Sequence, residues 1–306
     1  MLSSTSRCGE KNNDGFIIVA VLWILVALAT LAVVYSLYVN ETAVAFVDHN
    51  ERLEAQGLAM AGVELAAYRL TEIPDRRPIR GQFSFRQGSA VIGVDFGSEN
   101  GRIDLNFAPK EVLAGLFIGL GAEPQAALNF ADRIVAWRTP LAAGATDLEA
   151  SIYQGAGKTY GPRHGPLQSV DEIGLVVGMP AQLIDRALPY LTVYSGQGEV
   201  NVLSAPPAVL AALPGITPER LDMLLSQRQG APQDVVRAQL GMAASYVTLQ
   251  PSAADRINVD VRFASNRRIH SQAVVLVLDK DTEPYRVLSW RDEELSADAH
   301  ANAGLQ

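Results

Sequence analysis

The chain of 306 residues contains a single cysteine, Cys8, which lies in a short polar stretch before the first apolar run. The rest of the chain therefore has no thiol for a disulfide bond, a thiolate metal site or cysteine catalysis. Positive charge is also scarce, because 25 Lys and Arg stand against 33 Asp and Glu, a formal net charge of −8. This deficit argues against nucleic-acid binding, since contacts to phosphate need lysine and arginine in numbers.

The first long apolar stretch lacks charge altogether. Residues 16–39 contain no Asp, Glu, Lys, Arg or His. In a helix, about 20 such residues span the roughly 30 Å hydrocarbon core of a bilayer, and the run is too long for the apolar region of a signal peptide. Arg7 and Lys11 precede the run, and the next Lys or Arg is Arg52. We therefore expect an uncleaved single span with a cytoplasmic N-terminus.

The helical pattern continues beyond this span. Between Glu41 and Leu70 there is no proline, and apolar residues including Val47, Leu53 and Met60 recur mostly at steps of three, four and seven. We expect one helix from Phe16 to about residue 70. Alternating apolar and polar residues then predict strands at 82–86, 90–96, 101–107, 198–203, 246–249, 255–263, 269–278 and 285–290, with hairpin turns at Gly88 and at 98–101. Because residues 108–190 have a helical pattern, these strands surround a separate block of helices, which predicts an α+β fold.

A sequence repeat frames the helical block. Residues 101–116 align with residues 198–213, and each copy predicts a short strand, an Ala-Pro turn and a helix opened by proline. Second helices are expected at 124–137 and 218–228. A third pair is expected at 169–173 and 180–191, where Ser169 and Glu172 have the spacing of a capping box. The pairs resemble helix-hairpin-helix units, most clearly at Leu213-Pro-Gly-Ile.

A helix-hairpin-helix unit can offer backbone N–H groups to DNA phosphate, so a membrane-anchored DNA receptor is the alternative from another functional class. The charges after the hairpin cancel, since Glu219 and Asp222 balance Arg220 and Arg228. We therefore interpret the hairpins as packing units. Four histidines are scattered without acidic residues at metal-ligand spacing, at positions 49, 164, 270 and 300. No catalytic constellation emerges, and we expect no enzyme.

The start of the chain resembles the type IV prepilin and pseudopilin family. The resemblance rests on the polar leader, the Gly15-Phe16 step and the uninterrupted apolar run. It implies that a prepilin peptidase removes residues 1–15 and that the new amine of Phe16 is methylated. It also implies a single span, residues 16–39, in the inner membrane, with the globular part in the periplasm.

One departure points to a group within this family. Most members carry Glu at the fifth mature position, where this chain has Ala20. A carboxylate in hydrocarbon is costly unless it is paired, and in the family it is thought to meet the N-terminal amine of a neighbouring subunit. A chain without it, and with tandem helix pairs between its strands, resembles the K group of minor pseudopilins of type II secretion. A minor pilin of a type IV pilus is the alternative within the family.

The resemblance implies a pilin-like antiparallel sheet with an inserted all-helical domain of helix-hairpin-helix or SAM-like type. The predicted domains are residues 40–106, 107–197 and 198–294, with a disordered tail at 295–306. The implied function is that of a structural subunit at the pseudopilus tip. Its implied partners are I-type and J-type minor pseudopilins and the major pseudopilin, and nucleic acid is not among them. Ala20, Val47, Leu53 and Met60 are the predicted assembly positions.

The resemblance to the K group also implies a possible calcium-binding site. Its members often carry an acidic loop after a helix that ends in tryptophan, and the matching segment here is residues 137–153. Only Asp147 and Glu149 in this segment are acidic, and Arg138 and Pro140 stand where acids would be expected. Because calcium usually takes six to eight oxygen ligands, these two carboxylates are candidate ligands of an incomplete site.

Overall fold

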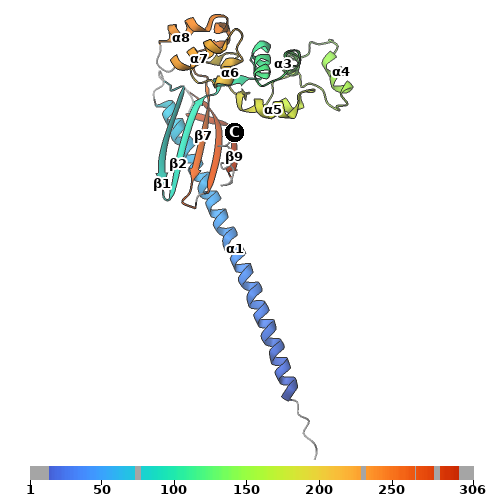
Figure 1. Cartoon of the computed structure of the whole chain (residues 1–306), viewed down its shortest axis with the longest axis vertical. Helices are drawn as coiled ribbons and strands as arrows, with labels where there is room; N and C mark the ends of the chain where they lie inside the picture. Colours follow the sequence, from blue (N-terminus) through green and yellow to red (C-terminus); the bar gives the residue numbers. More distant parts are fainter. Residues whose placement is uncertain (1–13, 73–76, 229–231, 266, 279–282, 296–306) are drawn as a thin grey trace, which may run out of the picture. The chain divides into compact units, whose positions relative to one another are not determined.

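The computed structural model describes residues 14–72, 77–228, 232–265, 267–278 and 283–295. Within these ranges, helix α1 (Asp14–Thr71) is followed by an antiparallel sheet and a set of short helices (Figure 1). The predicted α+β class is therefore confirmed, as is the single helix expected from Phe16 to about residue 70. Of the predicted leader, residues 1–13 lie outside the described residues, and residues 14 and 15 begin α1. Of the predicted tail at 295–306, Leu295 ends the last described strand, and residues 296–306 lie outside the described residues.

The first compact unit of the chain ends at Gly57. Its described part is helical, and residues Ile18–Val39 are apolar and long enough to cross a membrane, with a mean hydropathy of 2.8. The large apolar side chains of this segment are exposed. In water they would stay unburied, whereas in a bilayer they would face lipid tails.

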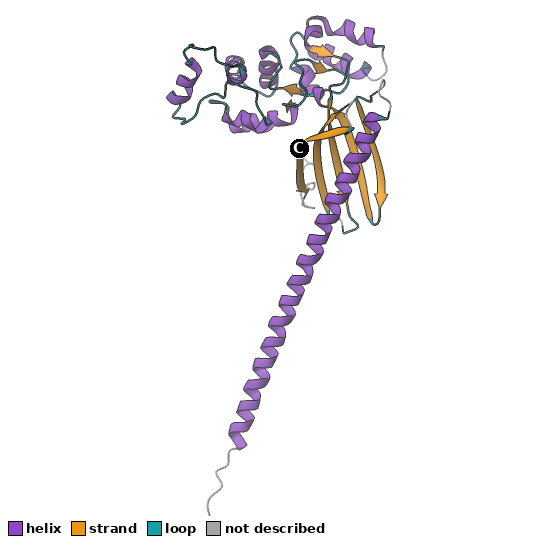
Figure 2. Cartoon of the chain, turned by 180° about the vertical axis from the view of Figure 1, so that it is seen from behind, coloured by secondary structure: helices purple, strands orange, loops and turns teal. Residues whose placement is uncertain are grey.

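The second compact unit, Leu58–Gln306, contains the end of α1 and a five-stranded sheet of order β1-β2-β7-β8-β9. The strands are β1 (Arg80–Gln87), β2 (Ala90–Ser98), β7 (Ala254–Arg262), β8 (Arg268–Val277) and β9 (Tyr285–Leu295), all paired antiparallel. Buried and less buried residues alternate along β2, so the sheet has one buried and one outer face. The end of α1 covers the buried face (Figure 2), where a Cβ on Gly62 would lie 2.9 Å from Cγ1 of Val259.

Strands β2 and β7 are neighbours in the sheet but distant in the chain, so residues 99–253 form an insertion between them. The insertion contains helices α2 (Lys110–Gly119), α3 (Pro124–Arg138), α4 (Leu148–Gly155), α5 (Ala181–Ala187), α6 (Pro207–Ala211), α7 (Pro218–Gln227) and α8 (Gln233–Leu240). Its short strands are β3 (Ile103–Asp104), β4 (Leu191–Thr192), β5 (Val200–Asn201) and β6 (Val247–Thr248). One hydrophobic cluster runs from Ile103 to Leu249 and takes in both helix pairs of the repeat.

Of the two predicted hairpin turns, one is confirmed and one is wrong. Gly88 joins β1 and β2 with a φ of 57°, a backbone conformation that glycine adopts without strain. Residues Glu99–Gly101 form a 3-10 helix (η2) instead of a turn, because β2 pairs with β7 while β3 pairs in parallel with β4. The chain enters the insertion here, and Glu99 and Asn100 are buried.

The third predicted helix pair also differs from expectation. Residues Val170–Leu175 form a 3-10 helix (η3), followed by α5. The predicted capping box is wrong by one residue at both ends: Ser169 Oγ accepts from the N–H of Asp171 at 3.2 Å, and Glu172 accepts from the N–H of Gln168 at 3.2 Å. A 3-10 helix has three residues per turn, so the N–H groups within reach differ from those of an α-helix.

The two copies of the repeat face each other across a local two-fold axis. Gly115 of α2 and Ala212 after α6 occupy the same position in the repeat, and a Cβ on Gly115 would lie 2.0 Å from the carbonyl oxygen of Ala212. Asn100 and Gln197, which precede the two copies, are also equivalent, and Nδ2 of Asn100 donates to Oε1 of Gln197 at 3.0 Å. Equivalent residues that meet each other are the mark of a two-fold arrangement.

Reciprocal contacts away from this axis agree with it. A Cβ on Gly101 would lie 2.7 Å from Oγ of Ser204, and a Cβ on Gly198 would lie 2.9 Å from the carbonyl oxygen of Phe107. Gly101 corresponds to Gly198, and Phe107 corresponds to Ser204. Each copy therefore uses a glycine to let its partner's loop approach closely.

Candidate functional site

The predicted processing and membrane positions lie in α1. Gly15 and Phe16 are in its first turns, and Ala20 lies within the apolar segment Ile18–Val39. Cleavage between Gly15 and Phe16 and the role of Ala20 in assembly stay predictions.

The predicted assembly face falls partly on exposed apolar residues. Met60, in the second unit, is 59% exposed although it lies within α1 next to the buried Ala59. Leu53, in the first unit, is 55% exposed. Val47 lies in α1, and nothing of its side chain is described. Tyr68 was not predicted and is 60% exposed, two turns beyond Met60 on roughly the same side of the helix. The exposed apolar residues of the helix end could therefore pack against another helix.

Of the two candidate calcium ligands, Asp147 already has other partners. Asp147 caps α4, because its Oδ1 accepts from the N–H of Ala150 at 2.9 Å. Its Oδ2 lies 2.8 Å from Nε2 of His164. Burial raises the pKa of Glu149, and one of its oxygens is buried without a hydrogen-bond partner in the part of the chain that the structure describes. Among the described residues, no three or more His, Cys, Asp and Glu side chains gather as a metal site would require.

Single acidic residues lie beside His270, whose Nδ1 is 2.9 Å from Oδ1 of Asp260, and beside His164. The ring of His164 bridges Asp147 and the carbonyl oxygen of Thr139, which lies 3.2 Å from Nδ1. The Asp147 hydrogen bond raises the pKa of His164. Asp147 and His164 are 17 residues apart, so helical or metal-ligand spacing could not reveal the pair. The pair joins Asp147, the residue before α4, to His164 in the chain after this helix.

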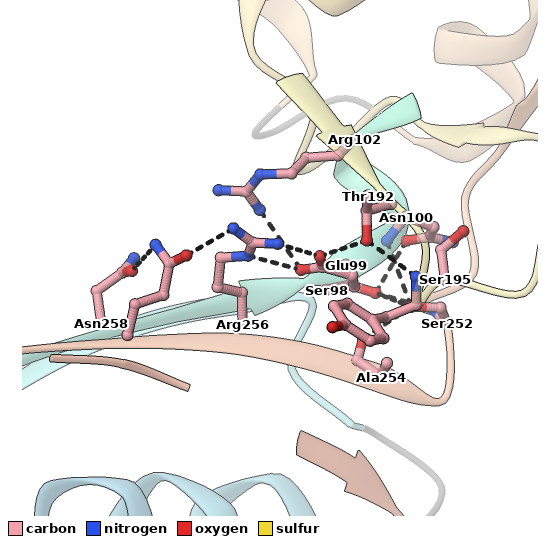
Figure 3. Close-up of polar contacts among 12 residues, drawn as sticks. Ser98, Glu99, Asn100, Arg102, Thr192, Ser195, Ser252, Ala254, Arg256 and Asn258 are labelled. Carbon is pink, nitrogen blue, oxygen red and sulfur yellow. Dashed lines mark hydrogen bonds and ion pairs between the residues drawn. The ribbon is translucent and has the colours of Figure 1, made fainter. Parts of the chain in front are cut away.

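A buried polar junction joins the insertion to the sheet (Figure 3). Glu99 is fully buried, and its Oε2 accepts from Nε of Arg256 in β7 at 3.0 Å. Thr192 in β4 donates its hydroxyl to Oε1 of Glu99 at 2.6 Å. Nη1 of Arg102 lies 3.6 Å from the same carboxylate. A buried carboxylate needs such partners, and these come from the sheet and from the insertion.

A second group of side chains extends the junction. Oγ of Ser98 donates to Oδ1 of Asn100 at 2.8 Å and accepts from the N–H of Ser252 at 2.8 Å (Figure 3). Asn100 also donates to the carbonyl oxygen of Gln250 at 2.9 Å. Ser98 precedes the insertion and Ser252 lies near its end. The two chain crossings are therefore held together by hydrogen bonds between side chains and backbone.

A buried carboxylate lies beside these crossings. Asp255 in β7 is fully buried and accepts from the guanidinium of Arg77. Burial raises the pKa of Asp255 to about 6, against the opposing effect of Arg77. The junction thus contains two buried acids, Glu99 and Asp255, each paired with an arginine.

An arginine braces each copy of the repeat. Arg138, at the end of α3, donates to the carbonyl oxygens of Leu105 at 2.6 Å and Ala108 at 2.7 Å. Arg228, just after α7, donates to Val202 at 3.3 Å and Ala205 at 2.6 Å. These acceptors are equivalent in the two copies. The aligned segments end before either arginine, but comparing the ends of the second helices could have revealed both.

Three comparisons with known proteins fit this arrangement. Residues 98–196 match the family model described as type II secretion system (T2SS), protein K. A type II secretion system protein K of Klebsiella pneumoniae is 32% identical over 121 residues, which cover 38% of this chain and 36% of that protein. A chain in the crystal structure of the GspK-GspI-GspJ complex of enterotoxigenic Escherichia coli matches with a TM-score of 0.55 and 16% identity, over 81% of this chain and 99% of that chain.

These comparisons confirm the resemblance to type II secretion protein K. The structural match supports the fold, and the family model covers the first part of the insertion, beginning at the polar junction. The aligned segment spans about a third of the length of the Klebsiella relative, 36%.

Proposed function

We propose that this chain, related by sequence to protein K of type II secretion, is a structural minor pseudopilin. In this proposal the prepilin peptidase removes the leader at Gly15 and Ile18–Val39 crosses the inner membrane once. The N-terminus stays in the cytoplasm, the head lies in the periplasm, and the chain sits at the pseudopilus tip. It meets I-type and J-type minor pseudopilins and the major pseudopilin, and has no catalytic role.

The observation that carries the proposal is a combination within one chain. An apolar helix precedes an antiparallel sheet, and the match to the K family falls on the insertion between β2 and β7. An apolar span alone would fit any anchored protein, and the sheet alone would fit many folds. The insertion separates the K group from other pseudopilins.

The tip position is supported by two features. The head is enlarged by the insertion of residues 99–253, which leaves less room for a subunit stacked above it. Ala20 replaces the carboxylate that pairs with a neighbouring amine in the family. Ala20→Glu would place a carboxylate in hydrocarbon at a cost of about 2.5–3.5 kcal/mol. We expect this change not to improve secretion, and a gain in pseudopilus assembly would contradict the tip position.

The exposed face of α1 gives the direct test. Met60→Glu should reduce co-purification with I-type and J-type minor pseudopilins, because it puts a charge on an apolar helix contact. Met60→Leu conserves volume and apolar character, so it should leave co-purification unchanged. Since Met60 is 59% exposed, neither change should unfold the head. Equal recovery of partners with both variants would contradict the assembly role of this face.

The DNA-receptor alternative gains no support from the hairpin after α6. The N–H of Ile216 donates to the carbonyl oxygen of Leu213 at 3.2 Å. Nη1 of Arg220 donates to the carbonyl oxygen of Gly215 at 3.3 Å. The side chain of Met242 comes within 3.0 Å of the Cβ position of Gly215. These groups serve internal packing in the second copy.

A further inference from the structure

A cleft of about 480 Å³ opens on the outer face of the sheet, where β1, β2 and β7 meet the insertion. Arg80 of β1 lies opposite Gly97 of β2, and Gly97 lies opposite Arg256 of β7. Opposite residues share a face of the sheet, so both arginines border the same space. Because Gly97 has no side chain, the floor between the two arginines stays open.

The arginines around the cleft differ in how far they are neutralised. The guanidinium of Arg256 is paired with the carboxylate of Glu99, and its Nη1 donates to Oε1 of Gln272 at 2.7 Å. Arg102 donates Nε to the carbonyl oxygen of Pro189 at 3.0 Å. Its Nη1 lies 3.6 Å from Oε2 of Glu99 (Figure 3). Arg80 is exposed, and its side chain makes no hydrogen bond or ion pair with any residue the structure describes.

Positive charge is in excess at this place, although the whole chain carries −8. The lining contains three arginines and one carboxylate, Asp95, which accepts from Nδ2 of Asn258 at 2.8 Å. Burial and the neighbouring Arg256 lower the pKa of Arg102 to about 10. Burial and the neighbouring Arg80 lower the pKa of Arg228. Cations therefore repel one another here, and a bound anion would relieve this repulsion.

A donor without a partner adds to the site. Ser204 lines the cleft, and its hydroxyl is buried with no hydrogen-bond partner among the described residues. Buried hydroxyl groups are normally satisfied. The hydroxyl of Ser204 is therefore not committed to another described residue.

We propose that this cleft binds a carboxylate side chain carried by an acidic segment of a partner protein. Guanidinium groups match carboxylates with two parallel hydrogen bonds. A cleft of about 480 Å³ has room for an acidic side chain with its neighbours, more than a lone anion needs. The adjacent β1 is an edge strand of the sheet, with β2 as its neighbour on one side. An extended acidic segment could lie along this edge and place a carboxylate in the cleft.

The inference rests on the proposed function only for the identity of the partner, which would be another pseudopilin. The arginines of the cleft would recognise a carboxylate whichever partner carries it. Binding of a synthetic peptide therefore tests the cleft, while the Met60 co-purification experiment tests the assembly role. The two can fail separately.

The test is fluorescence anisotropy with labelled hexaglutamate and hexaglutamine peptides and the full chain in nonionic detergent at low salt. We expect hexaglutamate to bind and hexaglutamine not to bind. Arg80→Gln should weaken binding about tenfold, since it removes a charge-assisted contact. Arg86→Gln is the matched control, because Arg86 is on the same strand and face, is also exposed, and does not line the cleft. It should change affinity less than about twofold.

A third variant removes space without removing charge. A Cβ on Gly97 would be in ordinary contact, 3.8 Å from Cβ of Arg80, so Gly97→Val should fold and fill the cleft. We expect it to weaken hexaglutamate binding at least as much as Arg80→Gln does. Equal losses for Arg80→Gln and Arg86→Gln would show diffuse attraction and overturn the proposal. Retained binding in Gly97→Val, or displacement of the peptide by an equimolar amount of inorganic phosphate, would overturn it as well.

Discussion

The two copies of the repeat have the same turn before the helix, but a different buried side chain holds it in each copy. In the first copy, Oδ1 of Asp104 accepts from the N–H of Asn106 at 2.8 Å, and in the second, Oδ1 of Asn201 accepts from the N–H of Leu203 at 2.9 Å. The second oxygen of Asp104 accepts from Ser195 at 2.8 Å. The amide nitrogen of Asn201 instead donates to the carbonyl oxygen of Gln250 at 3.0 Å.

This difference shows what fixes the residue type at a buried turn. The first oxygen is needed in both copies, because it holds the turn that precedes the helix. The remaining atom must match its neighbours: Asp104 faces two donors, Ser195 and the N–H of Gly196, whereas Asn201 faces an acceptor. A buried side chain that met its neighbours with the wrong polarity would leave a group unsatisfied.

The largest effect is expected where the copies touch. Gly115→Ala would place a Cβ 2.0 Å from the carbonyl oxygen of Ala212, so the helices would have to separate. We expect a loss of about 3 kcal/mol in the free energy of unfolding. Gly119→Ala in the same helix is the control, since a Cβ there meets no atom of the described residues within 4 Å and should stabilise the fold by about 0.5–1 kcal/mol.

Urea unfolding of the full chain in nonionic detergent, followed by tryptophan fluorescence, measures both variants. Similar stabilities for Gly115→Ala and Gly119→Ala would contradict the close contact between the copies.

A smaller effect is expected from the two braces. Arg138→Leu removes hydrogen bonds of 2.6 and 2.7 Å, and Arg228→Leu removes one of 2.6 Å and a weaker one of 3.3 Å. Each change leaves backbone carbonyls without their side-chain donor. We expect losses of about 2 kcal/mol for Arg138→Leu and about 1 kcal/mol for Arg228→Leu in the same unfolding experiment. A larger loss for Arg228→Leu than for Arg138→Leu would contradict this ranking of the two braces.

The braces illustrate what the sequence could not reveal. The long helix, the sheet strands and the helix pairs follow from apolar periodicity and from proline positions, both local signals. The predicted turn at 98–101 failed because Glu99 finds its partners, Arg256 and Thr192, far along the chain. Local polarity at this segment resembles an exposed turn, and only the tertiary fold shows that it is buried. The same holds for the pairing of His164 with Asp147.

The pH dependence of stability should separate the copies further. Burial raises the pKa of Asp104 above its ordinary value of 3.8. The folded chain therefore holds this proton to higher pH than the unfolded chain, and the free energy of unfolding falls as pH rises through the folded pKa. Asp104→Asn should remove this part of the pH dependence. It should also cost about 1 kcal/mol near neutral pH, because the N–H of Gly196 loses its acceptor.

Unfolding midpoints between pH 4 and pH 8 measure this effect. Asn201→Asp, the reciprocal change, should add a dependence of the same sign, since its carboxylate would face the carbonyl oxygen of Gln250. An unchanged pH profile in Asp104→Asn would contradict the assignment.

The smallest expected effect concerns DNA, for which only the second copy has the sequence of a phosphate-binding hairpin. Phosphate contacts need free N–H groups and a local excess of positive charge. The N–H of Ile216 donates to the carbonyl oxygen of Leu213 within the hairpin, and Nη1 of Arg220 donates to the carbonyl oxygen of Gly215. With Glu219 and Asp222 beside Arg220, the hairpin has no net attraction for a duplex. We therefore expect no measurable shift of duplex DNA by the full chain at moderate salt, and no difference between the wild type and Arg220→Gln. Micromolar binding that weakens steeply with salt and is lost in Arg220→Gln would instead make the second copy a DNA-binding unit, and the two copies would then differ in function as well as in chemistry.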